Sequence, residues 1–176
     1  SAHLITRLLS IGGQYGHWRD YARPRRAQLF LKWHIAMPLA TSLFGYFPGR
    51  KFGWLEDLPA GVAHEWSFRR ARLEQSHPPA ERAGVRQRFA SFRAPILAIT
   101  ATDDEFATQP ALRRALAYYH NAPAAAVMLT PEDLGFANIG HFGLFHARHR
   151  DGFWPATLRW LLAEENPWPE RLFALG

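Results

Sequence analysis

Three short apolar segments, each bounded by residues that break regular structure, stand out along the chain. Leu4–Ile11 ends in two glycines, Pro95–Ala101 begins at a proline and precedes an acidic turn, and Ala125–Thr130 stops at Pro131. Segments of this length and composition are typical of strands that are buried on both faces of a parallel sheet. The pattern therefore predicts three parallel strands.

Apolar residues at helical spacing follow the second and third of these segments. Thr108 is placed to cap a helix that ends near Asn121. Its apolar stripe consists of Leu112, Ala115, Leu116 and Tyr119. A second helix is expected to open at Asp151. Its sheet-facing stripe is predicted to consist of Trp154, Leu158, Leu161 and Leu162. Strand, helix and strand over this distance predict a right-handed parallel crossover, so the expected fold class is α/β.

Residues 25–92 show a different pattern, with three helical stretches and no predicted strand. The first stretch is Arg25–Phe47, in which we expect a kink at Pro38. The second covers 57–72 and the third covers Glu81–Phe92. The aromatic residues of the first stretch either line an acyl-binding pocket or form plain core, which is the commoner role of a helical stripe. They are Phe30, Trp33, Phe44, Tyr46 and Phe47.

Helices inserted between two strands of a parallel sheet often cover a site at the carboxyl ends of the strands. On the pattern alone, they serve equally well as a plain cover for one face of the sheet. We therefore divide the chain into a core strand (1–13), a helical cap (14–92) and the C-terminal part of the core (93–176). These parts form one domain that we expect to be incomplete at its N-terminus.

Composition and charge narrow the function classes. The 176 residues contain no Cys, which excludes a disulfide scaffold, a thiolate nucleophile and cysteine-ligated metal sites. The net charge is +6, but the arginines that carry most of it are scattered, which favours a solvated basic surface over a nucleic-acid or anionic-membrane surface. No secretory leader is visible, and no apolar run reaches the roughly 18 residues of a membrane span. We expect a cytoplasmic chain with no nucleic-acid partner and no transmembrane segment.

Residues suited to catalysis follow the second and third predicted strands. Asp103 and Asp104 come directly after PILAITA, and His141 lies in the loop after AAVMLT. Because the ends of neighbouring parallel strands converge, a carboxylate and an imidazole at these positions can meet. Such a carboxylate fixes the imidazole tautomer, while the other ring nitrogen takes a proton from a hydroxyl nucleophile. The alternative is that the aspartates cap the helix near Thr108 and that His141 is an ordinary loop histidine.

These segments resemble the α/β-hydrolase family. PILAITATDDEFATQPAL is similar to the strand-7 segment of that fold, in which an acidic turn bears the triad acid, and NIGHFGLF is similar to the loop that bears the triad histidine. GQYGHWRDY, LFGYFPGR and EDLPAGVAHEW are similar to segments of a group of bacterial α/β-hydrolases of uncharacterised substrate. The resemblance extends from the first strand to Leu162. It implies that Asp104, rather than Asp103, is the triad acid and that His141 is the base. The sheet would then be a partial parallel sheet, strands 6 to 8, with a helical cap insertion.

The chain departs from the family at the nucleophile. The family places a serine in a Gly-x-Ser-x-Gly elbow between strand 5 and a helix, and no such motif occurs in this sequence. The elbow and the missing N-terminal half of the fold are expected upstream of Ser1 or in a second chain. Ser10 is the nearest imitation, yet Leu8 stands where glycine is usual, so we expect Ser10 to be an ordinary residue near the end of its strand.

The resemblance implies the C-terminal portion of a serine hydrolase that acts on a hydrophobic ester, thioester or related acyl compound and has little activity alone. No metal or organic cofactor is implied. His17 and Trp18 are expected at the rim of the site, in contact with the substrate, although packing is the commoner role of such a Trp. We also expect an exposed sheet edge at Leu4–Ile11 or a partner that covers it. The alternative is a non-catalytic module of hydrolase-like fold that binds a ligand or a partner.

Overall fold

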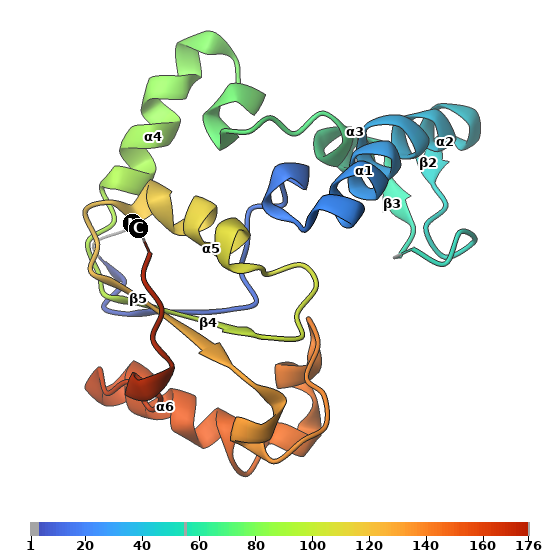
Figure 1. The fold of residues 1–176 in the computed structure, drawn as a ribbon. Helices are drawn as coiled ribbons and strands as arrows, with labels where there is room; N and C mark the ends of the chain where they lie inside the picture. Colours follow the sequence, from blue (N-terminus) through green and yellow to red (C-terminus); the bar gives the residue numbers. More distant parts are fainter. Residues whose placement is uncertain (1–3, 55, 176) are drawn as a thin grey trace. The chain divides into compact units, whose positions relative to one another are not determined.

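The three apolar segments form one parallel sheet in the computed structural model, which describes residues 4–54 and 56–175. The strands are β1 (Leu8–Ile11), β4 (Ile96–Ala101) and β5 (Ala124–Leu129). Their order in the sheet is β1-β4-β5, with the central strand paired in parallel to both neighbours (Figure 1). In this register Ile99 is paired with Ile11 on one side and with Val127 on the other. The three predicted strands and the α/β class are therefore confirmed, although the first strand begins at Leu8 rather than at Leu4.

Two compact units make up the chain. The sheet unit consists of Ser1–Gly16 and Arg86–Gly176, and the helical unit consists of His17–Val85. In sequence, the helical unit is one continuous insertion between β1 and β4. The inserted segment expected from the sequence was 14–92, whereas the units change at residues 17 and 86.

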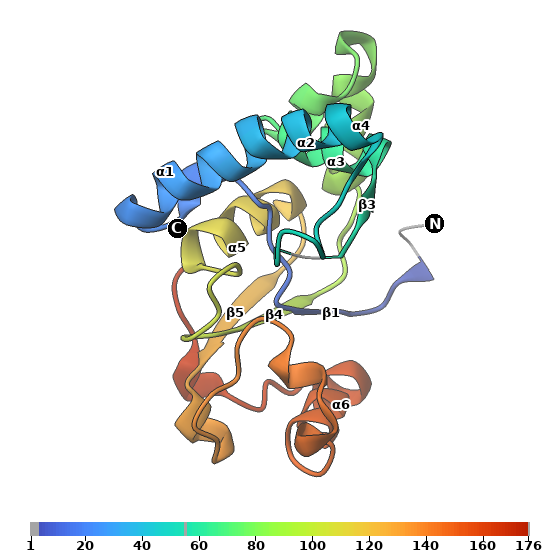
Figure 2. The ribbon, with the colours of Figure 1, turned by 90° about the vertical axis from the view of Figure 1, so that its right-hand side faces the viewer.

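One helix covers each face of the sheet, as Figures 1 and 2 show from two directions. On one face, α5 (Gln109–Leu116) begins after Thr108, whose side chain accepts a hydrogen bond from the Ala111 N–H, as predicted for its cap. The core beneath this helix comprises Phe92, Ile96, Ala98, Leu112, Leu116 and Ala126. On the other face lies α6 (Phe153–Ala163). Successive strand residues point to opposite faces, so each strand contributes to both cores.

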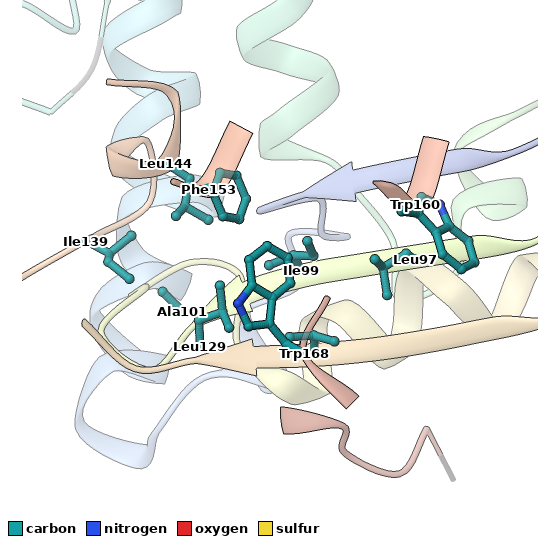
Figure 3. Close-up of a cluster of buried hydrophobic side chains, with 10 residues drawn as sticks. Leu97, Ile99, Ala101, Leu129, Ile139, Leu144, Phe153, Trp160 and Trp168 are labelled. Carbon is teal, nitrogen blue, oxygen red and sulfur yellow. The ribbon is translucent and has the colours of Figure 1, made fainter. Parts of the chain in front are cut away.

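The core beneath α6 is the larger one and is drawn in Figure 3. It comprises Leu97, Ile99, Ala101, Val127, Leu129, Ile139, Leu144, Phe153, Trp160 and Trp168. The rings of Phe153 and Trp168 stack with their centroids 5.4 Å apart. Short 3-10 helices connect the elements of this unit. They are Ala117–Tyr119, Pro131–Leu134, Gly143–Phe145, Ala147–His149 and Pro169–Arg171.

The stripe of α6 that faces the sheet is not the one expected from the sequence. The buried residues are Phe153, Thr157 and Trp160, which recur at helical spacing. The stripe that the sequence favoured is largely exposed: Trp154 37%, Leu158 52%, Leu161 38% and Leu162 77%. Apolar residues occur all round this helix, so periodicity alone does not decide which face packs. The aromatic residues Phe153 and Trp160 face the sheet. The Trp160 indole also donates a hydrogen bond to the Leu8 carbonyl at 3.2 Å.

The helical unit contains helices and, against expectation, one small sheet. Its helices are α1 (Arg23–Leu31), a π-helical segment (Lys32–Ala36), α2 (Met37–Phe44), α3 (Ala60–Ser67) and the start of α4 (Arg82–Ala90), with 3-10 turns at Trp18–Asp20, Leu73–Ser76 and Pro79–Glu81. The prediction of no strand was wrong, because β2 (Tyr46–Phe47) pairs antiparallel with β3 (Leu58–Pro59). Strands of two residues are too short to show an alternating pattern. The second predicted helix accordingly begins later than expected.

The first helical stretch runs from α1 to α2 without a break and ends at Gly45, which is left-handed with φ 76°. A kink was expected at Pro38, and the structure has a π-helical segment just before this residue. Pro38 has no N–H to donate to the His34 carbonyl, and the Met37 N–H instead bonds to the Lys32 carbonyl. Within the described residues, neither this run nor any other helix combines the length and apolar character needed to cross a bilayer.

The core of the helical unit is small. Its buried members are Met37, Ala40, Phe47 and Ala63. Of the aromatic residues expected as a core stripe, Phe47 is fully buried, whereas Phe30, Phe44 and Tyr46 are 38%, 46% and 44% exposed. The expectation of a plain core therefore holds for only part of that stripe.

Candidate active site

An aspartate and a histidine meet at the carboxyl ends of β4 and β5. Asp104 lies in the turn after β4, and His141 lies in the loop after β5. The Nδ1 atom of His141 is 2.9 Å from Oδ2 and 3.0 Å from Oδ1 of Asp104. Only 2% of the Asp104 side chain is exposed, compared with 20% of the imidazole. The contact predicted from the strand ends is therefore present.

The turn after β4 fixes the Asp104 carboxylate. Its Oδ1 accepts hydrogen bonds from the N–H groups of Phe106 and Ala107, both at 2.8 Å. Burial opposes ionisation and alone would raise the pKa of Asp104. The hydrogen bonds from His141, Ala107 and Phe106 and the charge of His141 outweigh burial and lower the pKa below its ordinary value of 3.8. Asp104 is thus ionised at neutral pH, and it both caps its turn and accepts from the imidazole.

Asp103, the neighbouring carboxylate, has a different task. Its Oδ2 accepts hydrogen bonds from the N–H groups of Ile139 at 2.7 Å and Gly140 at 3.1 Å. These two residues directly precede His141, and Gly140 has the left-handed φ of 70°. Asp103 therefore holds the histidine loop against the end of β4. Sequence reasoning weighed Asp103 as a second choice for the acid and as a cap for the helix near Thr108. It missed this role, which depends on backbone groups far along the chain.

Aromatic rings and one glycine surround the imidazole. The ring of Phe106 lies edge-on at 5.3 Å and that of Phe142 at 4.6 Å from the His141 ring, measured between centroids. Gly12, just after β1, has a φ of 61°, and a Cβ added there would lie 3.6 Å from the imidazole. All three strands of the sheet thus end at this site. The two glycines after the first strand were the signal in the sequence for the close approach of β1.

This arrangement suits general acid–base chemistry. With its Nδ1–H directed at the Asp104 carboxylate, His141 is held in the tautomer whose Nε2 accepts a proton, and the carboxylate stabilises the imidazolium that forms. Metal chemistry finds no comparable support. Across residues 4–54 and 56–175, no three histidine, aspartate or glutamate side chains are grouped as metal ligands.

The nearest candidate nucleophile in the sequence, Ser10, lies inside a strand. It is paired with Ala98 in the middle of the β1–β4 register, and β1 continues beyond it to Ile11. Its hydroxyl is turned toward Gly13, because a Cβ built on that glycine would lie 2.2 Å from Ser10 Oγ. A nucleophile elbow requires a sharp turn between a strand and a helix. Ser10 therefore occupies the ordinary strand position that we expected for it.

His17 and Trp18, predicted to contact substrate, belong to the helical unit. Their rings are 5.8 Å apart between centroids. Both side chains line a cavity within that unit. Their contact with a substrate stays a prediction.

Comparisons of the chain with family models, with curated proteins and with solved structures find no match. The geometry of the strand ends is thus the basis on which a function can be assigned.

Proposed function

We propose that the chain is the portion of a serine hydrolase that carries the acid and the histidine of the catalytic triad. The contact between Asp104 and His141 Nδ1 at 2.9 Å carries this proposal. In the proposed reaction, His141 Nε2 removes the proton from a serine hydroxyl as that oxygen attacks the carbonyl of an ester or thioester. His141 then returns the proton to the leaving group, and Asp104 keeps the imidazole oriented throughout. The resemblance to α/β-hydrolases supports the same reading.

The nucleophile, in this proposal, comes from polypeptide outside these 176 residues. The sequence contains no Gly-x-Ser-x-Gly, and Ser10 lies within a strand. The oxyanion hole would come from the same missing part. A hydrophobic acyl substrate is in keeping with the phenylalanine rings beside His141.

The free edge of β1 supports a continuation of the sheet. The Leu8 N–H donates to the Pro95 carbonyl, and the Gly12 N–H donates to the Ile99 carbonyl. Because backbone groups of successive strand residues point to alternate sides, the N–H and C=O groups of Leu9 and Ile11 point away from β4. Among the described strands, β1 has β4 as its one neighbour. An edge of this kind can pair with a further strand.

The opposite edge of the sheet is different. There, Leu172 forms a bridge with Val127, and the Phe173 N–H bonds to the Ala126 carbonyl at 3.0 Å. The C-terminal segment thus covers β5, whereas no described segment covers β1 in this way. In this proposal, a further strand therefore pairs with the outer edge of β1.

The exposed stripe of α6 adjoins the free edge. The Arg7 guanidinium, just before β1, donates to the Leu161 carbonyl at 3.1 Å and lies 3.6 Å from the Glu164 carboxylate. The apolar stripe of α6, including Leu158 at 52% and Leu162 at 77% exposure, is therefore beside the outer edge of β1. A contiguous exposed apolar surface of this kind marks an interaction site. We propose that the nucleophile-bearing part covers both the outer edge of β1 and the apolar stripe of α6.

A fluorophosphonate probe tests this function. The native protein, tagged at the C-terminal end of this chain and purified from its own cells, is labelled, digested and analysed by mass spectrometry. We expect one labelled serine, in a Gly-x-Ser-x-Gly peptide, and loss of the label in His141→Ala. The matched control is His146→Ala, since His146 is exposed in the same loop region and makes no contact with Asp104. No labelled serine, or labelling that survives His141→Ala, would sink the proposal.

The second candidate is a non-catalytic module that binds a ligand, and the cavity of the helical unit favours it. The two functions differ in one result of the same experiment. A binding module yields no labelled serine in the intact protein. A hydrolase yields a serine whose labelling depends on His141.

A further inference from the structure

A cavity of about 530 Å³ lies wholly within the helical unit. Its volume falls in the range of small-molecule pockets, about 300–1,000 Å³. Its walls come from the segment around His17 to Arg19, from α1 with the π-helical segment, and from the chain that follows α3. Three arginines and two histidines are among the lining residues, which include no aspartate or glutamate.

Aromatic rings form one wall of the cavity. The ring of His17 lies 5.8 Å from that of Trp18, Trp18 lies 5.1 Å from Phe30, and Phe30 lies 5.0 Å from His34, all between centroids. The four rings thus make a continuous row from the turn at His17 and Trp18 to α1 and the π-helical segment. Phe30 keeps 38% of its surface exposed, so the row is not closed off by packing. Such a wall suits a flat, unsaturated ring.

Arginines supply the charge of the cavity. Arg69 and Arg70 lie on the segment after α3, and Arg19 has its guanidinium 4.8 Å from the centroid of the Trp18 ring. Carboxylates partly offset this charge. Glu65 lies 3.7 Å from Arg69, and the buried Asp20 and Glu74 are sequence neighbours of lining residues, but none of the three is part of the lining. Guanidinium groups bind carboxylate and phosphate oxygens through paired N–H donors. The cavity therefore favours an anionic group near its aromatic wall.

The π-helical segment places two residues in the cavity. His34 and Ile35 both belong to it and both line the cavity. The Nδ1 of His34 contacts the carbonyl oxygen of Ser67, which joins the aromatic wall to the segment after α3. π-helical turns interrupt an α-helix at some cost and are frequent at functional sites. Here the interruption, caused by Pro38, shapes the cavity wall.

We propose that this cavity binds a small aromatic anion, a ligand with a planar ring and a carboxylate or phosphate group. The ring lies against Trp18 and Phe30, and the anionic group faces Arg69 and Arg70. This inference does not rest on the proposed hydrolase function, because it concerns a cavity confined to the helical unit and a binding event without turnover.

Isothermal titration calorimetry with four probes tests the proposal on the whole chain. The probes are 2-naphthoate, 2-naphthyl phosphate, the neutral 2-naphthamide and inorganic phosphate alone. We expect saturable binding of at least one naphthyl anion, at least tenfold tighter than binding of 2-naphthamide or of inorganic phosphate. Preference between the two naphthyl anions identifies the anionic group, and equal binding of both supports the shared chemistry.

Variants separate the contribution of charge from that of the ring. Arg70→Gln is expected to weaken binding of the naphthyl anion about tenfold and to leave binding of 2-naphthamide unchanged. Trp18→Leu is expected to weaken binding of both. Arg150→Gln is the matched control, because Arg150 is exposed in the sheet unit and pairs only with its neighbour Asp151. Its affinities should equal those of the unaltered chain. Thermal unfolding confirms that each variant is folded.

Any of the following results would overturn the proposal. One is equal affinity for 2-naphthoate, 2-naphthyl phosphate and 2-naphthamide, which removes the role of charge. Another is inorganic phosphate bound as tightly as the naphthyl anions, which removes the role of the ring. The last is binding of none of the probes, or binding that both Arg70→Gln and Trp18→Leu leave intact while each remains folded.

Discussion

The sheet unit and the helical unit use their polar side chains in opposite ways. In the sheet unit, the Asp103 and Asp104 carboxylates accept hydrogen bonds from nearby backbone N–H groups, and Asp104 also pairs with His141. In the helical unit, arginines and aromatic rings line an open cavity. The difference teaches which kind of function each unit suits. Fixed polar groups give an oriented reactive nitrogen, and an open, charged and aromatic lining gives a place for a ligand.

The same contrast appears in how much each site contributes to folding. The residues that fix His141 also close the loops at the end of the sheet, so changing them should weaken the fold. Most residues that line the cavity are partly or fully exposed, although His17 and Ser67 are buried, and changes at the exposed ones should be nearly neutral for stability.

The largest effect is expected in the core beneath α6. Phe153 is 1% exposed, and Phe153→Ala should lower the free energy of unfolding by about 3–5 kcal/mol, because it removes a buried ring and leaves a cavity. Leu158→Ala, on the outer face of the same helix, should change it by less than about 0.5 kcal/mol in the isolated chain. Urea unfolding measures both. Equal losses would show that the wrong face of α6 has been assigned to the core.

A smaller loss is expected at Asp103. Asp103→Ala leaves the N–H groups of Ile139 and Gly140 without their acceptor and should cost about 1–3 kcal/mol. Asp103→Asn keeps one carbonyl oxygen and should cost less. Urea unfolding gives the free energies, and the amide NMR shifts of residues 139–141 report the loop. A loss below about 0.5 kcal/mol with unchanged shifts would contradict the role given to Asp103.

The free energy of unfolding, measured at falling pH, should show the contribution of the Asp104 carboxylate to stability. Because its pKa is lower in the folded chain than the ordinary 3.8, the unfolded chain takes up this proton first as the pH falls. The stability that Asp104 contributes is therefore complete above about pH 4 to 5 and is lost as the pH falls through the folded-state pKa. Asp104→Asn should reduce the slope of the free energy of unfolding against pH in this range. Asp151→Asn, on the surface, should keep the slope of the unaltered chain. An identical slope in all three proteins would refute the assignment.

The smallest effect is expected in the cavity of the helical unit. Phe68 lines it and is 60% exposed. Phe68→Ser should change the free energy of unfolding by less than about 0.5 kcal/mol, as for most exposed positions. A loss above about 1 kcal/mol would mean that the lining is packed core, and the contrast between the units would disappear.

The sheet could be predicted from strong local signals, and the strand ends placed Asp103 or Asp104 near His141. The choice of Asp104 came from the resemblance to α/β-hydrolases. Strands bounded by glycine and proline are readable, and parallel strands bring their carboxyl ends together. The packing face of α6 was not readable, since Leu158 and Trp160 are both apolar and only tertiary contacts choose between them. The loop bonds of Asp103 were missed for a related reason. Their partners, Ile139 and Gly140, are backbone groups whose positions follow from the folded loop rather than from residue type.

The proposed reaction requires that Nδ1 of His141 carries the proton and faces Asp104, so that Nε2 can accept one. Nitrogen NMR signals of the ring measure this directly. Long-range proton–nitrogen correlation spectra distinguish a neutral imidazole that is protonated at Nδ1 from one that is protonated at Nε2. We expect Nδ1 to carry the proton in the unaltered chain and to lose this preference in Asp104→Ala, with the exposed His146 unchanged in both. A proton on Nε2 of His141 in the unaltered chain would contradict the account, because that nitrogen could not then accept a proton from a serine.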